Sequence, residues 1–213
     1  MAIAMLALAT QLSAAGTEPV IQVDFSNNGG APSQWTMTLR PDGTGHFRTQ
    51  KGKAPVDQPV AMDTPGVDRD FQLTASYAAR VFDEAERRKW FNEPCESHMK
   101  VAFQGWKTFT YTGPQGSGAC TFNYSKDKDL QGLAESFEAV AQTLLEGARL
   151  EMLLQHDRLG LDAEMEFLTQ AAADGRVQQI SAIREILERL TQDDQVLERV
   201  RKRARALLDH EIR

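Results

Sequence analysis

Apolar and polar residues alternate through much of the first half of the chain. Ile21, Val23 and Phe25 are each followed by a polar residue. This period of two places the three apolar side chains on one face of a β-strand. Alternation and turn spacing predict further strands over 35–39, 46–49, 71–73, 99–103, 107–111 and 119–124.

Turn signals between these segments favour antiparallel pairing. Residues 40–45 read Arg-Pro-Asp-Gly-Thr-Gly, where proline presets φ and glycine accepts positive φ. One amphipathic helix interrupts the strands, because apolar residues over 77–85 recur at spacings of three and four. Thr74 or Ser76 can cap it. The order of strands, helix, strands and helix predicts an α+β fold, with an antiparallel sheet backed by helices.

The period changes at Asp127. Apolar residues from Leu130 to Ala148 recur at three and four and predict a long helix that reaches about His156. Similar patterns predict helices over 162–173, 177–190 and 194–210. We therefore expect four segments: a signal peptide at 1–15, a β-rich α+β domain at 19–126, a long connecting helix at 127–156 and a helical C-terminal segment at 157–213.

One stretch of the C-terminal segment resembles a known repeat. Within 193–208, an Asp-led turn precedes a helix with Val-Arg and Ala-x-x-Leu spacing. It resembles the second half of a HEAT-type helical repeat. The resemblance implies a helical hairpin, since a solenoid buries a continuous core only with about three or more units.

Net charge limits the class of partner. The formal net charge is -6 and the pI is near 5.3. A protein whose whole surface binds nucleic acid usually has a basic excess, so we expect no nucleic-acid partner. Hydrophobic residues make up 41% and charged residues 25%, which is typical of a globular protein.

The N-terminus predicts export. Residues 1–15 carry no charge, are mostly apolar and end in Ser-Ala-Ala, the small residues that a signal peptidase requires. No basic residue precedes the apolar run, so either the true start lies upstream or the segment is a buried N-terminal helix. No later stretch has the length of a membrane span. We expect a periplasmic or extracellular protein.

Cys95 and Cys120 are the only cysteines, and an oxidising compartment would let them form a disulfide. Two alternatives stay open: a pair of buried thiols, or a zinc site completed by His98, for which no fourth ligand is evident. In a meander of the strands at 99–103, 107–111 and 119–124, Cys95 would lie two strands, about 10 Å, from Cys120. A bridge needs Cα atoms within about 7 Å, so the disulfide predicts that the chain folds back or that the strand order differs.

The densest polar cluster follows the long helix. His156 and Asp157, with Asp162 and Glu166, could supply a general base or metal ligands for a hydrolase. The alternative is helix termination and capping, with acidic residues that suit the first turn of the next helix.

Other motifs favour structural interpretations. The glycine-rich stretch 113–118 joins two predicted strands and lacks the Gly-Lys-Ser/Thr ending of a phosphate-binding loop. Residues 199–205 hold five cations, which could bind anionic lipid or nucleic acid but also suit a solvated helix face. Residues 123–125 form a glycosylation sequon.

These observations favour a non-enzymatic, exported binding or structural module whose helical tail docks a protein partner. We expect no cofactor and no metal ion. The alternative is a hydrolase or metal-dependent enzyme built on the cluster at 156–166.

Overall fold

A computed structural model describes residues 18–53, 59–60 and 62–210. The predicted signal peptide at 1–15 lies outside these residues. No helix among the described residues is long and apolar enough to cross a membrane.

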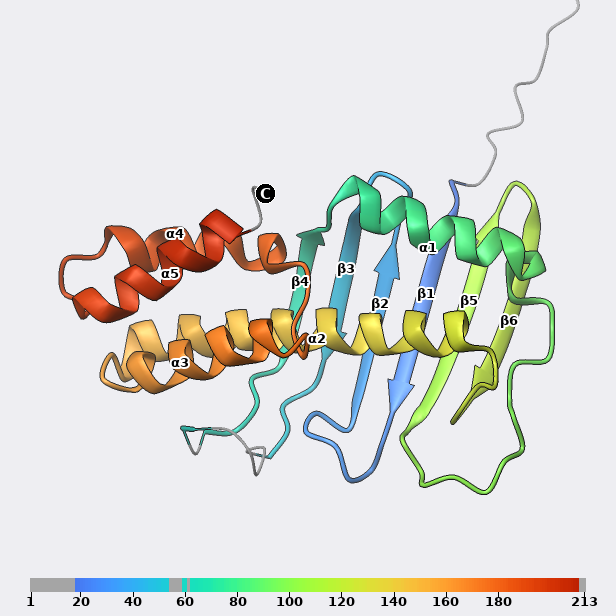
Figure 1. Ribbon diagram of the computed structural model, residues 1–213, viewed down its shortest axis with the longest axis horizontal. Coiled ribbons are helices and arrows are strands. Elements are labelled where there is room, and N and C mark those ends of the chain that lie inside the picture. Colours follow the sequence, from blue (N-terminus) through green and yellow to red (C-terminus); the bar gives the residue numbers. More distant parts are fainter. Residues whose placement is uncertain (1–17, 54–58, 61, 211–213) are drawn as a thin grey trace, which may run out of the picture.

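Six antiparallel strands form one sheet, which confirms the predicted α+β class (Figure 1). Their order across the sheet is β4-β3-β2-β1-β5-β6. The strands are β1 (Val20–Ser26), β2 (Gln34–Leu39), β3 (Thr44–Thr49), β4 (Val67–Gln72), β5 (Trp106–Gly113) and β6 (Gly116–Phe122).

The helices form two groups, and α1 with η1 lies between β4 and β5 in the chain. The first contains α1 (Ala75–Arg87), the 3-10 turn η1 (Lys89–Phe91) and α2 (Lys128–His156). The second contains α3 (Gly160–Ala173), the 3-10 turn η2 (Ile180–Ile183), α4 (Arg184–Gln192) and α5 (Glu198–His210). The Thr74 side chain caps α1 and the Asp127 carboxylate caps α2.

The β2–β3 turn has the geometry that its sequence predicts. Arg40 N donates to Thr44 O at 2.8 Å, and Gly43 has a φ of 84°. A Cβ at Gly43 would lie 2.5 Å from Leu73 O, so no other residue fits without a shift of the backbone. Within the stretch 113–118, Pro114 and Gln115 form the β5–β6 hairpin turn, Gly113 pairs with Gly116, and residues 116–118 begin β6.

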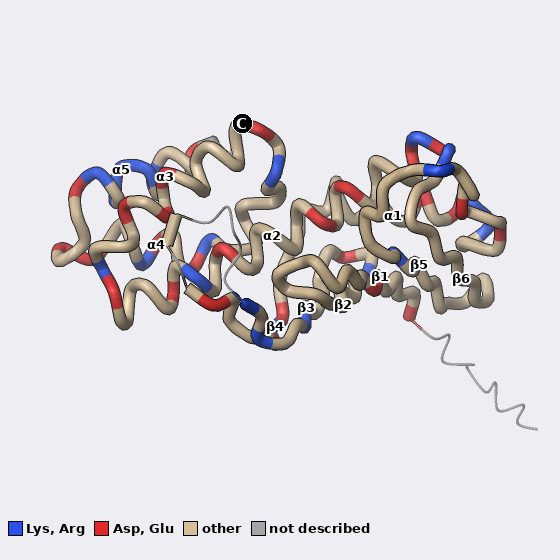
Figure 2. Tube along the Cα trace, turned by 90° about the horizontal axis from the view of Figure 1, so that it is seen from below, with Lys and Arg blue, Asp and Glu red and all other residues tan. Residues whose placement is uncertain are grey.

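Helices α1 and α2 cover one face of the sheet (Figures 1 and 2). The apolar phase of each strand points toward them; for example, the Phe109 ring meets Phe137 of α2 edge-on, at 5.6 Å between centroids. Figure 2 shows no described element over the opposite face of the sheet. The sheet therefore has one covered face and one open face.

Helix α2 belongs to two hydrophobic clusters. Its N-terminal part, from Leu130 to Ala148, packs on the sheet, whereas Leu150, Leu153 and Leu154 pack with α3, α4 and α5. In Figure 1 the C-terminal helices extend beyond β4, alongside the end of α2. The long helix thus joins the sheet to the helical segment.

The predicted strand at 99–103 is wrong. This stretch is irregular and passes the end of β6, where the Asn123 side chain donates to Ala102 O at 3.4 Å. Met99 and Phe103 are exposed instead of buried. The alternation at 99–103 misled because side chains, not a neighbouring strand, satisfy much of its hydrogen bonding. Met99 N donates to Ser97 Oγ at 3.1 Å, and just after the stretch Gln104 N donates to the Asn123 side chain at 2.7 Å.

Candidate functional site

The open face of the sheet is polar and rich in hydroxyl groups. Cross-strand pairing aligns Thr36 of β2, Asp24 of β1, and Thr108 of β5 in one row. A parallel row contains Thr38, Gln22 and Thr110. Away from the β4 side, most side chains on this face are neutral hydrogen-bonding groups.

The β4 side of this face is charged. His46 of β3 lies between two carboxylates, with Nε2 3.1 Å from Asp68 and Nδ1 2.8 Å from Asp70. Arg48 lies 3.7 Å from Asp68. These contacts hold β3 to β4 and leave the centre of the face, over β1, β2 and β5, to uncharged groups and Asp24.

A groove of about 460 Å³ crosses the open face near the β1–β2 connection. This volume is within the range of small-ligand clefts. We call it the open-face groove; its lining includes Asp24, Ser26, Gln34, Thr36, Arg48, Lys51, Trp106 and Thr108.

Asp24 lies at the floor of the open-face groove. Its Oδ1 accepts from Thr36 Oγ1 at 2.7 Å, and its Oδ2 accepts from Gln22 Nε2 at 2.8 Å. These two bonds fix the orientation of the carboxylate. Since a carboxylate offers about four lone-pair positions, Asp24 keeps acceptor capacity for a further donor.

The two sides of the open-face groove differ in chemistry. Trp106 lies on the β5 side and is 47% exposed. The Phe103 ring packs edge-on against it, with 6.0 Å between the ring centroids. On the β3 side stand Arg48 and Lys51. The groove thus combines an aromatic wall, a hydrogen-bonding floor and a cationic wall.

A second hollow of about 540 Å³ lies between β4, the residues before it and α2. Arg69 and Glu151 line it and form an ion pair at 2.6 Å. Both are part of the attachment of β4 to α2, so their charges already have partners.

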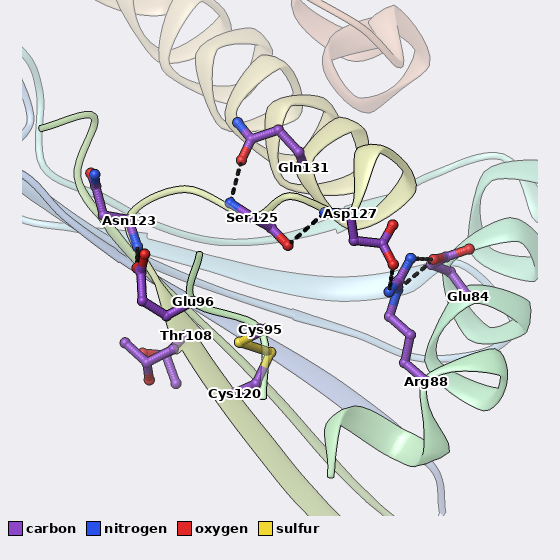
Figure 3. The surroundings of a disulfide bond; sticks show 11 residues. Glu84, Arg88, Cys95, Glu96, Thr108, Cys120, Asn123, Ser125, Asp127 and Gln131 are labelled. Atoms are coloured by element: carbon purple, nitrogen blue, oxygen red, sulfur yellow. Dashed lines mark hydrogen bonds and ion pairs between the residues drawn. A yellow bond between two sulfur atoms is a disulfide. The ribbon is translucent and has the colours of Figure 1, made fainter. Parts of the chain in front are cut away.

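The structure joins Cys95 and Cys120 by a disulfide, with Cα atoms 6.0 Å apart (Figure 3). Cys120 lies on the covered face of β6, and the chain leaving η1 passes along that strand to reach it. The chain therefore folds back, as the predicted bridge requires. Both thiols are used in the bridge, so neither is available to the zinc site considered with His98.

Glu96, next to this disulfide, takes the place of a strand partner for the end of β6. Its carboxylate accepts from Asn123 N at 2.6 Å and from His98 N at 2.9 Å. Desolvation opposes ionisation of Glu96, but these N–H donors outweigh it and hold the pKa below its ordinary value. The ionised side chain anchors the irregular segment.

The four residues of the predicted cluster are not brought together as one site. Asp162 lies 2.7 Å from Arg199 Nε and 2.6 Å from Arg203 Nη1, and Glu166 lies 3.2 Å from Arg203 Nη2. These ion pairs join α3 to α5. The hydrogen bond from Arg199 is the largest effect on Asp162 and lowers its pKa. Burial opposes it, and the hydrogen bond from Arg203 lowers the pKa further.

His156 and Asp157 lie at the end of α2. Asp157 Oδ1 accepts from Gly160 N at 3.3 Å, which shapes the turn into α3. Within the described part of the chain, no hydrogen bond or ion pair joins His156 to a carboxylate. Helix α3 starts at Gly160, so Asp162 occupies its first turn instead of capping it.

Most of the cations predicted on the last helix have carboxylate partners. Besides Arg199 and Arg203, Arg201 lies 2.6 Å from Glu198, and Arg205 lies 3.6 Å from the same residue. This pairing reduces the positive charge that α5 presents to solvent.

Three carboxylates, Glu84, Asp127 and Asp129, lie close enough together to hold a cation. Figure 3 shows the Arg88 guanidinium between Glu84 and Asp127, to which it is hydrogen-bonded. Arg87 also pairs with Glu84. Two guanidinium groups therefore supply the positive charge at this position, and we assign it no metal.

A comparison with protein families, curated proteins and solved structures gives no match.

Sequence reasoning missed the open-face groove because its residues come from four separate segments. The usable signal was the phase of the strands: Trp106 shares its phase with Thr108, Thr110 and Thr112, and not with the buried Phe109. An aromatic residue in the polar phase of a strand is expected on the exposed face.

Proposed function

We propose that this protein is an exported, non-enzymatic binding module whose ligand lies in the open-face groove. The single observation that carries the proposal is the half-exposed Trp106 at the wall of a groove with a polar floor. A large aromatic side chain that is exposed to solvent can contact a ligand without any rearrangement of the hydrophobic core.

The chemistry of the groove supports binding over catalysis. Among the described residues that line it, Asp24 is the one carboxylate, and none is a histidine or cysteine. The two carboxylate oxygens of Asp24 accept hydrogen bonds from neutral side chains, those of Thr36 and Gln22. A nucleophile with an adjacent base, or a pair of carboxylates, is the usual requirement for hydrolysis.

Export is supported by the disulfide. Bridges persist in oxidising compartments and are rare in the cytosol. The Cys95–Cys120 bond holds the irregular segment that carries Phe103, which in turn contacts Trp106. In this proposal the oxidising environment also maintains one wall of the groove.

The helical segment at 157–213 is the part we propose to contact a protein partner. Leu159, in the α2–α3 turn, is 80% exposed, and Leu197, before α5, is 39% exposed. Arg158 donates to Gln195 at 2.9 Å, which places the two turns beside each other. We propose that both exposed leucines contribute apolar contacts to the partner at this end of the helices.

A thermal-shift screen tests the binding proposal without assuming a ligand class. Compounds that bind only the folded protein raise its melting temperature. A library of sugars, nucleotides, organic acids and short peptides should contain a class that stabilises the wild type but not Trp106→Ala. Met99→Ala is the matched control, because Met99 is 50% exposed and does not line the groove.

Two results would contradict the proposal. One is a library in which no compound stabilises the protein, or in which stabilisation survives in Trp106→Ala. The other is conversion of a stabilising compound to products by the purified protein.

A further inference from the structure

We infer that the ligand of the open-face groove is an uncharged oligosaccharide. This inference rests on the proposed binding function and adds the chemical class of the ligand. It follows from the shape of the groove, the groups on its floor and the balance of charge around it.

The groove suits an extended ligand. It runs from Arg48 on β3 across β2 and β1 to Thr108 on β5. Three inter-strand spacings separate these strands, which makes its length about 14 Å. It lies on the face of the sheet, where strand backbones are already paired with one another, so a ligand must be recognised through side chains.

The groups along this length match a ring with hydroxyls at its edge and C–H groups on its faces. Trp106 presents an apolar ring surface, which can stack on the C–H face of a sugar. Next to it, Ser26 pairs in register with both Trp106 and Gln34. Hydroxyl and amide groups both donate and accept, which is what a row of sugar hydroxyls requires.

Asp24 adds an oriented acceptor in the middle of the floor. Thr36 and Gln22 hold its two oxygens in place, and its remaining lone pairs can accept from ligand hydroxyls. The same carboxylate would repel a phosphate or carboxylate ligand seated over it.

The charges around the groove balance. Arg48 and Lys51 supply two positive charges, while Asp24 on the floor and Asp68 beside Arg48 supply two negative charges. Both side chains of the Arg48–Asp68 pair are well exposed, so the pair contributes little binding energy of its own. Its two charges still offset one another, and the electrostatic field in the groove is weak. A neutral polar ligand fits this field better than an anion or a cation.

The test is calorimetric titration of the full-length chain with three neutral hexasaccharides: β-1,4-linked glucose, β-1,4-linked N-acetylglucosamine and α-1,4-linked glucose. Inositol hexaphosphate serves as the anionic comparison. We expect at least one hexasaccharide to bind, with roughly tenfold weaker affinity for Trp106→Ala and for Asp24→Asn. Met99→Ala should bind as the wild type does, and circular dichroism should show all variants folded.

Absence of binding by all three hexasaccharides would overturn the inference, as would binding that Trp106→Ala leaves unchanged. If the sugars fail while another class stabilises the protein through Trp106, the ligand class is wrong and the proposed function stands. If the thermal-shift screen is also empty, both fail.

Discussion

The helical segment and the open face of the sheet use polar residues in opposite ways. In the helical segment, charged residues that crowd together in the sequence are paired internally, as Asp162 is with Arg199 and Arg203. On the open face, polar residues from distant segments meet around a groove, and Asp24 on its floor keeps lone pairs for a further donor beyond Thr36 and Gln22. Density of chemical groups along a sequence is therefore a poor guide to a binding site, because neighbouring charges on helices readily satisfy one another.

Arg149, in the C-terminal half of α2, is a deeply buried example of a charged residue that is paired internally with the helical segment. Its side chain is 1% exposed, lies 2.7 Å from Glu164 of α3 and donates to the carbonyl oxygens of Val60 and Met62, each at 3.0 Å. Glu146, one turn away on α2, is also fully buried. The guanidinium thus joins two helices to the chain that precedes β4.

The largest expected effect is that of Arg149→Met. Removing the cation leaves two buried carboxylates without it, and breaking a buried ion pair costs about 3–5 kcal/mol. Urea unfolding should show that loss. Arg184→Met is the control, since Arg184 forms an exposed pair with Glu188, worth about 0.5 kcal/mol or less. A loss below about 1 kcal/mol for Arg149→Met would show that the pair does not organise the helical segment.

The disulfide comes next. The double variant Cys95→Ser, Cys120→Ser removes a covalent link between residues 25 positions apart in the sequence. In the chain-entropy description its loss should lower the free energy of unfolding by about 3.5 kcal/mol. Thiol titration of the denatured, unreduced wild type should find no free thiol. Two free thiols in material from an oxidising compartment would argue against both the bridge and export.

A smaller effect is expected for Asp162→Asn, and it should depend on pH. The folded-state pKa of Asp162 is lowered, so its contribution is present above the unfolded value, about 3.9, and is lost as pH falls through the folded-state pKa. Because Arg199 is largely exposed, we expect only about 1 kcal/mol near pH 7. The difference from the wild type should disappear in acid, as measured by chemical denaturation across pH.

Asp209→Asn is the control for that experiment, since Asp209 is exposed on α5. A difference between Asp162→Asn and the wild type that grows toward acid would contradict the ion-pair assignment. Loss of a catalytic activity in Asp162→Asn with unchanged stability would instead favour the hydrolase hypothesis.

The smallest expected change in stability is that of Trp106→Ala, about 0.5 kcal/mol or less, because the ring is already half in water. Trp35→Ala, on the covered face of the neighbouring sheet region, should cost about 3–5 kcal/mol. Thermal or urea unfolding of the two variants compares the faces directly. Equal losses would mean that Trp106 is a core residue and not the wall of a binding groove.

Much of the fold could be predicted from periodicity. The Thr74 cap, the turn at 40–45 and the long helix that ends at His156 all follow from local residue patterns, and the structure has each of them. Local patterns decide these features because the groups that satisfy the backbone lie a few residues away.

The rest depends on contacts distant in sequence. The stretch 99–103 alternates like a strand, yet it has no strand partner because the chain folds back to the disulfide. Asp162 looked like a catalytic candidate until its partners, about forty residues further along the chain, were known. The open-face groove required the strand order, which places β1 between β2 and β5 and so brings Asp24 beside Thr108.

The most direct test of the groove uses the three tryptophan indole N–H resonances of the ¹⁵N-labelled protein. The chain has three tryptophans, of which Trp35 is buried and Trp90 stacks on Tyr111. Saturating the protein with a compound found in the thermal-shift screen should shift the Trp106 resonance most. Trp35 also lines the groove and can shift to a smaller extent, whereas Trp90 does not line it and its resonance should stay nearly unchanged. A shift confined to Trp90, or bound ligand with no change at Trp106, would contradict the assignment of the open-face groove as the binding site.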